Sequence, residues 1–374
     1  MENNRIYVCH TFYHVYITFL KEFKLRSERK EAGIPIGDAS VMLSKLSIDF
    51  GSLRERLEAL GFFKDVIEFD EKRDDFFPEL KKWRDGRGNL VGNLIYRMIF
   101  TSKYAKAEEK YVPVDMKQYD GIYVFCDSDP IGYYLNKHRI KYHAIEDGLN
   151  VLRNFDAARY DNRGHFKLKA FMSERLNLIF VQNGYGKYCI DMEVNDKSLI
   201  QYQYRKYKSE SRTALADRLT SDEKELLLKA FVTDWDELRL KVDEANQKGD
   251  AILILTDPIC ALDVRERIFR DIVDEYKVQG SIFIKPHPRD ILDYRKLFPE
   301  YPIIESGMPM EIFNYFPGLH FRTAVTVLTE MKAIKFADNI VRKGEDFMDI
   351  YEDPAVHRQN ESIGIGRPRP DDKE

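Results

Sequence analysis

A histidine between two prolines is the feature of this sequence with the clearest chemical meaning. It follows an apolar run, residues 280–284, that is typical of a buried strand. In open α/β sheets ligands bind at the carboxyl ends of the strands, and the prolines restrict the backbone there. The candidate phosphate contacts at this strand end are Lys285, His287, Pro288 and Arg289. The alternative is that His287 only caps the strand by bonding to the backbone.

Two adjacent carboxylates follow another apolar run. Glu146, Asp147 and Gly148 come directly after residues 140–145, which are expected to form a strand. Neighbouring side chains in an extended segment point to opposite sides, so only one of the two carboxylates is expected to enter a site. A partly desolvated carboxylate there could act as the general base for a sugar hydroxyl. The alternative is a plain turn, which acidic residues followed by glycine often form.

A third group of candidates follows the apolar run of residues 251–255. Thr256 and Asp257 end this run, and Asp263 precedes a helix that is expected from residue 264 onward. Asp263 could cap that helix, because the N–H groups of a first turn need an acceptor. The same position could also face the site, and the two roles are compatible.

Two later segments also offer ligand contacts. Residues 305–311 are expected to open a helix, and they bring Glu311 and backbone donors to its start. Helix N-termini bind phosphate, whereas a carboxylate at that place suits the hydroxyl pair of a ribose. Arg322 and Thr323 precede a further expected helical segment and could contact an anion. Thr323 could equally be a simple helix cap.

Asp127 and Asp129 form a D-x-D pattern, which many glycosyltransferases use to hold a metal on a nucleotide diphosphate. We interpret the pattern as structural instead, because Asp129 precedes a proline and aspartate followed by proline is typical of a helix start. The sequence contains no Walker A loop, no G-x-G-x-x-G and no H-E-x-x-H, and G-x-S-x-G is also absent. Signatures of P-loop, dinucleotide-redox, zincin and serine-hydrolase chemistry are therefore missing.

Composition narrows the class of protein further. The chain has 374 residues, a formal net charge of -4 and 33% charged residues of both signs, which gives no reason to expect nucleic-acid binding. Its four cysteines are scattered without a C-x-x-C pair, so a zinc site or disulfide framework is not expected and a reducing, cytoplasmic location fits. No segment resembles a signal peptide or reaches the roughly 20 apolar residues of a membrane-spanning helix.

Strands and helices are expected to alternate, which predicts an α/β fold with mostly parallel sheets. Expected strands and helices of the first half cover residues 5–9, 13–29, 41–46, 53–60, 65–69, 121–126, 132–138 and 140–145. A second series covers residues 251–255, 264–276, 280–285 and 302–304. The length suits two domains, and we expect two Rossmann-like domains that face a central cleft, over residues 1–215 and 216–355, followed by a polar tail at 356–374.

The acidic-acidic-glycine motif of residues 146–148 and the His-Pro motif around His287 together resemble motifs of bacterial sialyltransferases. The wider layout is most similar to glycosyltransferase family 52, the lipooligosaccharide and capsule sialyltransferase group. Four further stretches in the family's order support this resemblance. They are residues 8–11, which end in Thr11, residues 254–258 leading into Asp263, residues 304–311, and residues 322–328.

The resemblance implies a GT-B fold, inverting transfer, no metal or other cofactor, and a CMP-sialic acid donor bound mainly by the second domain. His287 matches the histidine that supports the departing phosphate, and Glu311 matches a glutamate on the nucleotide side. Asp263 matches one proposed base, whereas Glu146 and Asp147 match the base motif of related families, so the base stays open. Thr11, Gly148, Thr256 and Asp257 are counted among the substrate contacts.

Arg322 and Thr323 stand where sialyltransferases usually place paired hydroxyls against phosphate, and this departure leaves the donor sugar open. The expected partners are a nucleotide sugar and a glycan acceptor of a surface polysaccharide or glycolipid precursor. The alternatives are a UDP-sugar hexosyltransferase of the same fold and a noncatalytic nucleotide- or glycan-binding protein. Peripheral contact with the inner face of a membrane and formation of a homodimer also stay open.

Overall fold

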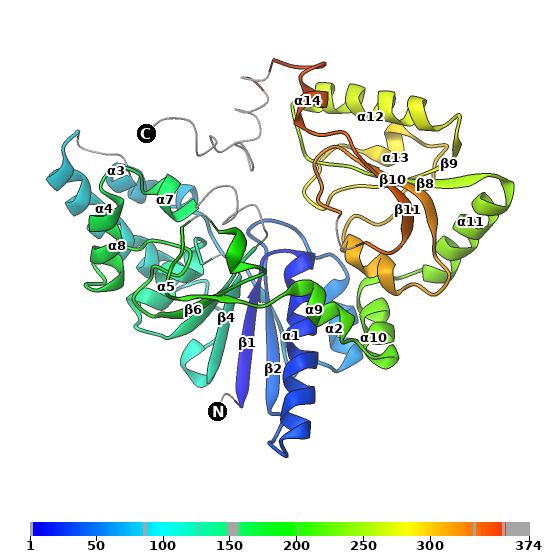
Figure 1. Cartoon of the computed structure of the whole chain (residues 1–374). Coiled ribbons are helices and arrows are strands. Elements are labelled where there is room, and N and C mark those ends of the chain that lie inside the picture. The colour runs from blue at the N-terminus through cyan, green and yellow to red at the C-terminus, as the bar shows by residue number, and fades with distance from the viewer. Residues whose placement is uncertain are drawn as a thin grey trace. The chain divides into compact units, whose positions relative to one another are not determined.

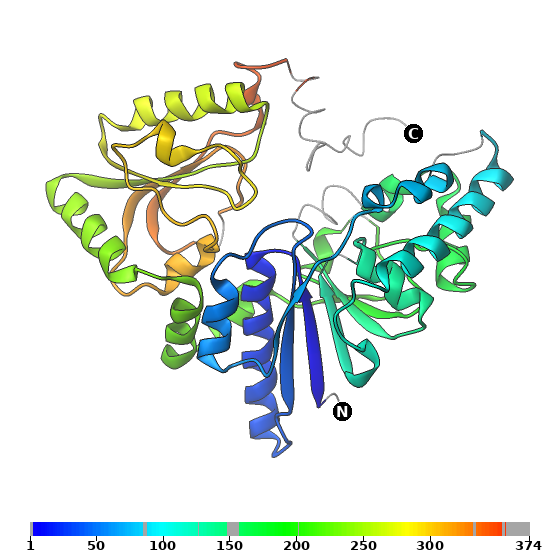
Figure 2. The ribbon, with the colours of Figure 1, turned by 180° about the vertical axis from the view of Figure 1, so that it is seen from behind.

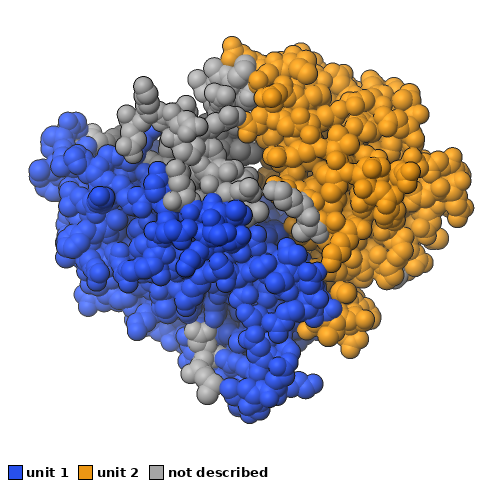
Figure 3. Space-filling view, in the orientation of Figure 1, with its two compact units in different colours: residues 1–219, 372–374 blue, residues 220–371 orange. Residues whose placement is uncertain are grey.

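The computed structural model describes residues 3–84, 88–125, 127–147, 157–200, 202–331, 334–353 and 356. The chain folds as two compact units that divide between Leu219 and Thr220, coloured separately in Figure 3. The expected tail, residues 356–374, lies outside the described residues except for Val356. No helix in the described ranges is both long and apolar enough to cross a membrane.

The first unit is built on a seven-stranded parallel sheet with the strand order β3-β2-β1-β4-β5-β6-β7. Its strands are β1 (Asn4–Cys9), β2 (Asp38–Ser44), β3 (Val66–Phe69), β4 (Gly121–Phe125), β5 (Tyr142–Ile145), β6 (Cys189–Val194) and β7 (Tyr207–Ser209). Its helices are α1 (Phe12–Glu31), α2 (Leu53–Leu60), α3 (Lys81–Arg84), α4 (Leu90–Glu108), α5 (Pro130–Lys137), α7 (Ala157–Asp161), α8 (Phe166–Glu174) and α9 (Arg212–Asp217).

The direction in which strands are added reverses between β1 and β4. After β1 the chain adds β2 and β3 on one side of it, and then adds β4, β5, β6 and β7 on the other side. Connections between parallel strands are right-handed, so the helices that follow β1 and β4 must lie on opposite faces. Figure 1 shows α1 and α5 on the two sides of the sheet, and Figure 2 shows the same from behind. The carboxyl ends of β1 and β4 therefore flank a topological switch point, where ligands of open α/β sheets bind.

The second unit has a four-stranded parallel sheet with the order β11-β10-β8-β9. Its strands are β8 (Asp250–Leu255), β9 (Gly280–Lys285), β10 (Phe321–Thr326) and β11 (Ala337–Arg342). Its helices are α10 (Ser221–Phe231), α11 (Trp235–Lys248), α12 (Leu262–Tyr276), α13 (Tyr294–Leu297), α14 (Glu345–Met348) and the 3-10 helix η5 (Met310–Tyr315). Figure 1 shows α11 and α12 on opposite sides of this sheet.

The segment around Arg322 is a strand and does not precede a helix as the sequence suggested. Phe321–Thr326 is buried or half-buried except at Arg322, and it pairs with β8 and β11 on its two sides. A short apolar run buried on both faces has no alternating pattern, so a strand and a buried helix are hard to distinguish in sequence. The expected strand at 302–304 reduces to a bridge between Ile303 and Ile284.

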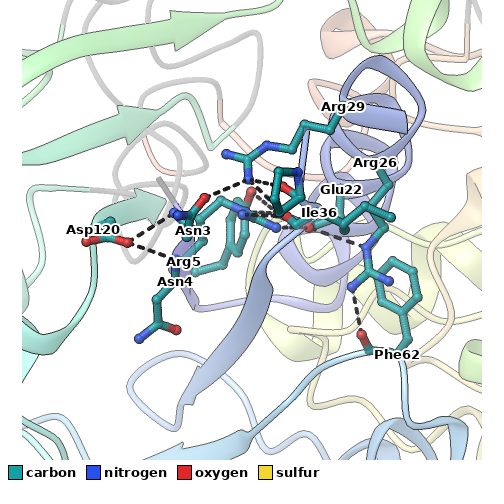
Figure 4. A network of polar contacts seen from close by, with 11 residues as sticks. Asn3, Asn4, Arg5, Glu22, Arg26, Arg29, Ile36, Phe62 and Asp120 are labelled. Carbon is teal, nitrogen blue, oxygen red and sulfur yellow. Dashed lines mark hydrogen bonds and ion pairs between the residues drawn. The ribbon is translucent and has the colours of Figure 1, made fainter. Parts of the chain in front are cut away.

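A buried ion pair fixes α1 against β1 at the amino end of the first sheet (Figure 4). The Nε and Nη2 atoms of Arg5 donate to the two carboxylate oxygens of Glu22 at 2.8 and 2.9 Å, and the Tyr7 hydroxyl donates to Glu22 Oε1 at 2.7 Å. Removing one partner of such a pair leaves the other charge buried without a partner, which typically lowers the free energy of unfolding by about 3–5 kcal/mol. The pair therefore fixes the direction of α1, whose first turn lies at the opposite, carboxyl edge of the sheet.

Candidate active site

Imidazole and carboxylate groups from four strand ends gather at the carboxyl edge of the first sheet. His10 follows β1, Glu71 follows β3, Asp129 follows β4 and Asp147 follows β5, while His14 lies in the first turn of α1. This cluster surrounds the switch point between β1 and β4. Groups that are far apart in the sequence meet there because parallel strands place all their carboxyl ends on one edge.

His10 is a buried imidazolium held by two carboxylates. Its Nε2 atom lies 2.8 Å from Glu71 Oε2 and 3.3 Å from Asp129 Oδ2. Burial alone would lower the pKa of His10, but the charges of Asp129 and Glu71 outweigh it and raise the pKa to about 9. Glu71 is itself fixed, since it accepts bonds from the Ser44 hydroxyl at 2.6 Å and from the Ile131 N–H at 2.8 Å. The cluster thus contains a permanent positive charge at neutral pH.

Asp129 is the member of this group that titrates near neutral pH. Burial raises its pKa to about 7, the charges of Glu71 and Asp147 add to the rise, and the His10 cation opposes it. Asp129 precedes the first residue of α5, yet its side chain makes no capping bond. A helix start was predicted here, but the carboxyl group itself faces His10 instead of the helix.

Asp127 has the structural role that the sequence predicts. Its carboxylate is buried and accepts bonds from the backbone N–H groups of Asn183 at 2.6 Å and Gly184 at 3.1 Å, and from the Tyr142 hydroxyl at 3.2 Å. The two aspartates of the D-x-D pattern therefore have different surroundings. Asp127 is buried and bonded to the backbone, and Asp129 belongs to the cluster. Within the described ranges, no group of three or more His, Cys, Asp or Glu side chains is placed to hold a metal ion.

His14 is a neutral donor that holds Asp147. The backbone N–H of His10 donates to His14 Nδ1 at 2.9 Å, so the ring proton lies on Nε2, which bonds to Asp147 Oδ1. Burial lowers the pKa of His14 despite the nearby Asp147 charge, and the ring stacks on Phe125 with the centroids 4.4 Å apart. The Asp147 side chain is 39% exposed, so this oriented carboxylate is partly accessible to solvent.

Glu146 makes its bond outside this cluster, as the alternation of an extended backbone leads us to expect for one of two adjacent carboxylates. Its side chain is buried and accepts a bond from the Asn195 N–H at 2.8 Å. Burial raises the pKa of Glu146 to about 7, although that bond and the Arg212 charge favour the ionised form. Gly148, the third residue of the motif, lies outside the described residues.

The raised pKa of Glu146 predicts a dependence of stability on pH. Between pH 4.5 and 7 the unfolded chain releases this proton while the folded chain keeps it, so stability falls as pH rises and stays lower above pH 7. The side chain in Glu146→Gln cannot ionise. The free energy of unfolding of this variant, measured by chemical denaturation, should therefore rise relative to that of the wild type by up to about 3 kcal/mol across that range. The exposed Glu79→Gln is the control. Parallel curves for the wild type and Glu146→Gln would contradict a protonated Glu146.

His287 is fixed by both of its neighbours at the carboxyl end of β9. Its backbone N–H donates to Thr256 Oγ1 at 3.0 Å, and its Nδ1 atom accepts the Arg289 N–H at 3.1 Å. Because a backbone N–H only donates, the neutral ring must carry its proton on Nε2. Burial lowers the pKa of this half-buried imidazole to about 3, and the Arg289 and Lys285 cations contribute. The alternative interpretation, in which His287 bonds to the backbone, is therefore met at one ring nitrogen, Nδ1, and Nε2 is not involved in that bond.

A buried network that sequence reasoning missed supports the turn after His287. Arg265 donates to Asp290 Oδ1 at 2.6 Å and to the carbonyls of Ile259 and Cys260 at 2.6 and 3.0 Å. Asp290 Oδ2 accepts the hydroxyl of Tyr294 at 2.8 Å. The Asp290 N–H in turn donates to the His287 carbonyl at 2.9 Å. The arginine on α12 thus holds the loop that carries the histidine.

Lys285 and Glu311, predicted as nucleotide contacts, lie close together in the second unit. Burial lowers the pKa of Lys285 to about 8, and the charges of Glu311 and Glu305 oppose this shift. The Lys285 ammonium donates to the Ser306 carbonyl at 3.4 Å. Burial also raises the pKa of Glu311, which begins η5 together with Met310. Pro288 and Arg289 extend this edge on the side of His287, half-buried and exposed respectively.

Three predicted contacts form hydrogen bonds within the fold. Asp257 is buried, and its oxygens accept bonds from Thr326 Oγ1, Val327 N, Leu328 N and Thr329 Oγ1 at 2.8, 3.1, 3.0 and 2.6 Å. Thr256 is buried beneath His287 and bonds to it. Thr11 caps α1, since its hydroxyl accepts the N–H of His14 at 3.2 Å. Thr256 and Asp257 are buried, whereas Thr11 is half-buried.

Three other predictions need correction. Ala261 is the N-cap of α12, so Asp263 does not cap it and is instead an exposed residue of the first turn. Arg322 pairs with Asp338 at 3.2 Å and lies 3.9 Å from Asp250, the first residue of β8. Thr323 pairs with Ile252 near the same end of the sheet. Arg322 and Thr323 therefore belong to the amino half of β10, because the strand runs on to residue 326.

Sequence reasoning missed the unit 1 residues that hold the carboxylates. His10, His14 and Glu71 were not among the candidates, although two histidines four residues apart at a strand-to-helix junction are a recognisable signal. Residues four apart face the same side of a helix. Glu71 carries no such signal, since an acidic residue after a short strand is common at protein surfaces.

Comparisons with known proteins agree with this architecture. The 2,6-sialyltransferase of Photobacterium sp. JT-ISH-224, solved with CMP and lactose, is similar with a TM-score of 0.53 and 10% identity over 97% of this chain and 80% of that chain. The α/β-galactoside α-2,3-sialyltransferase of Photobacterium phosphoreum gives a TM-score of 0.46 and 11% identity over 90% and 89% of the two chains. The predicted α/β fold of the GT-B type is confirmed.

Sequence comparison gives the family. An uncharacterized protein of Haemophilus influenzae is 27% identical over 100 residues, which are 25% of this chain and only 30% of that relative's length. The model of glycosyltransferase family 52 matches residues 93–329, which is more than half of the chain and includes Asp147 and His287. The chain belongs to glycosyltransferase family 52.

Proposed function

We propose that the protein transfers sialic acid from CMP-sialic acid to a galactoside of a surface-polysaccharide or glycolipid precursor, with inversion and without a metal. Family membership and the fold shared with a sialyltransferase that binds CMP and lactose support this proposal. The observation that carries it is the orientation of His287, whose Nδ1 is occupied by a backbone N–H. Its Nε2–H is therefore the group available to a ligand at the end of β9.

The second unit would bind the donor and stabilise the leaving group. When the bond between the sugar and the phosphate oxygen breaks, that oxygen gains negative charge and the sugar gains positive charge. His287 Nε2–H would donate to this oxygen, and Lys285 would supply further positive charge beside it. The pKa of His287 is low without a ligand. A bound phosphate would raise it, because a nearby negative charge favours the protonated imidazole.

The first unit would activate the acceptor through Asp147. The carboxylate would take the proton of the attacking hydroxyl as the new bond to the sugar forms, in a single displacement that inverts the anomeric centre. Asp147 fits this role best because it is partly exposed and held by His14. Glu146 is buried and already accepts a bond from the Asn195 N–H. Asp263 lies on the exposed surface of α12, where no described side chain holds it.

Donor choice is the decisive test of this proposal. CMP should raise the melting temperature, and at about 100 times its Kd it should add about 2.7 kcal/mol of stability, whereas UDP at equal concentration should add little. Incubation with CMP-sialic acid and lactose should then give sialyllactose. A protein stabilised by UDP but not by CMP would contradict the sialyl donor. Binding of CMP with neither transfer nor donor hydrolysis would contradict the enzymatic activity.

A further inference from the structure

The first unit contains a cavity of about 670 Å³ that the proposed chemistry does not use. Residues of α3, α4, α5, α7 and α8 line it, together with the segment around Phe180. Figure 1 shows these helices gathered on one side of the first sheet. The volume lies within the range of about 300–1,000 Å³ that is usual for small-molecule sites. Ser128, which also lines the cavity, immediately precedes Asp129 of the cluster described above.

Aromatic rings form much of the cavity wall. They are Trp83, Tyr96, Phe100, Tyr133 and Phe180. Trp83 and Tyr96 have their centroids 4.9 Å apart, and Tyr133 and Phe180 lie 4.7 Å apart. Such rings present flat apolar faces, and the tyrosine and tryptophan rings also carry a polar O–H or N–H. The C–H face of a sugar ring is complementary to a flat apolar surface of this kind.

The charges in the lining are mostly positive. The cations are Arg84, Arg97, Arg163 and Lys169, against the single carboxylate of Asp161 among the described residues. Arg84 is paired with Asp74 at 2.9 Å, and Asp161 accepts a bond from Gln182 at 2.6 Å. The lining therefore has an excess of positive charge over its one acid.

Arg97 and Lys169 are two cations of the lining that donate to backbone carbonyls. Arg97 donates to the Phe180 carbonyl at 3.0 Å, and Lys169 donates to the carbonyls of Asn162 and Arg163 at 3.3 and 3.0 Å. Neither forms an ion pair with a carboxylate in the part of the chain that the structure describes. Burial lowers the pKa of both groups, although Tyr133 and the Asp161 charge oppose the shift at Arg97. An anion in the cavity would relieve the cost of burial by pairing with both.

We propose that this cavity binds a segment of the acceptor glycan that carries an anionic group, either a carboxylate or a phosphate. The proposal rests on the proposed function, because it assigns the cavity to the acceptor. Arg97 and Lys169 pair with the anion, and the aromatic wall contacts the sugar ring that carries it. Ser128 of the lining is followed in the chain by Asp129, whose carboxylate lies 3.3 Å from His10 in the cluster that would receive the attacking hydroxyl.

The test compares three disaccharides by calorimetry in the absence of donor. Lactose is neutral, lactose 1-phosphate carries a phosphate, and lactobionate carries a carboxylate at the same end. At least one anionic disaccharide should bind about tenfold or more tightly than lactose, since a charge-assisted bond contributes at least one tenfold step. The stronger of the two identifies the anion. Equal binding of all three would overturn the proposal.

Arg97→Gln should remove this preference, so that the anionic sugars bind no better than lactose. Lys106→Gln is the matched control, because Lys106 is an exposed cation of the same helix outside the cavity. Equal preference in both variants would overturn the role of Arg97. Lys169→Gln is a second variant, for use if Arg97→Gln melts at a lower temperature than the wild type. It should also bind the anionic sugars with less preference over lactose.

Transfer assays separate a failure of this inference from a failure of the proposed function. Loss of the anion preference in Arg97→Gln, with no transfer from CMP-sialic acid by any protein, would support the cavity and reject the sialyl donor. Transfer to lactose with identical KM values for all three acceptors would support the donor and reject the cavity.

Discussion

Replacing His287 with alanine is expected to lower the rate of transfer by about 10²–10⁴-fold, the range typical of a lost general acid or oxyanion donor. The half-buried ring makes one backbone bond through Nδ1, and the backbone bond to Thr256 does not depend on the side chain. The fold should therefore survive. Initial rates at saturating CMP-sialic acid and lactose, with melting temperatures measured in parallel, check this expectation.

Two further variants show what the imidazole supplies. His320→Gln is the control, since His320 is an exposed histidine of the same unit that pairs with Asp338 at 2.9 Å. It should keep the wild-type rate. His287→Gln offers an amide N–H, which can donate a hydrogen bond but cannot transfer a proton. A rate near the wild type in His287→Gln would indicate a hydrogen-bond donor, whereas a rate like that of His287→Ala would indicate proton transfer. An unaltered rate in His287→Ala would reject the mechanism.

The strand ends of this protein could be predicted from sequence because their signals are local. The apolar run before His287 and its flanking prolines give the end of β9 directly, and the run before Glu146 gives the end of β5. Which side chain of an adjacent pair faces the site is also local, since it follows from the alternation of an extended backbone. The prediction could not say that the exposed one is Asp147, because that depends on the neighbouring Asn195 and His14.

The errors in the predicted site come from contacts between distant segments. Asp257 looks available for a ligand until the loop after β10 folds over it and occupies its oxygens. Arg322 looks like an anion contact only while Arg322 and Thr323 are expected to precede a helical segment. Once they are part of β10, the parallel register with β8 fixes Arg322 near Asp250 at the amino end. The cluster of the first unit is assembled from four strand ends, and such registers between distant strands cannot be read from the sequence.

Asp147→Asn is expected to reduce transfer by about 10²–10⁴-fold, because asparagine keeps the shape of the side chain but cannot accept the proton of the acceptor hydroxyl. Asp263→Asn should keep the wild-type rate, since Asp263 is exposed on the first turn of α12. Rates of sialyllactose formation check both variants. The stabilisation of each variant by CMP should be unchanged, because the proposed donor contacts lie in the second unit. A slow Asp263→Asn beside a normal Asp147→Asn would reverse the assignment of the base.

His14→Gln tests whether the Asp147 carboxylate depends on the histidine that holds it. Glutamine keeps an N–H donor, but it lacks the rigid ring that stacks on Phe125 and accepts the His10 N–H. We expect a loss of about tenfold, smaller than that of Asp147→Asn, since the carboxylate remains but is less well oriented. The double variant His14→Gln/Asp147→Asn should be no slower than Asp147→Asn alone, because a positioning residue has no effect once the group that it positions is gone. Losses that multiply in the double variant would show instead that His14 acts on the reaction independently of Asp147.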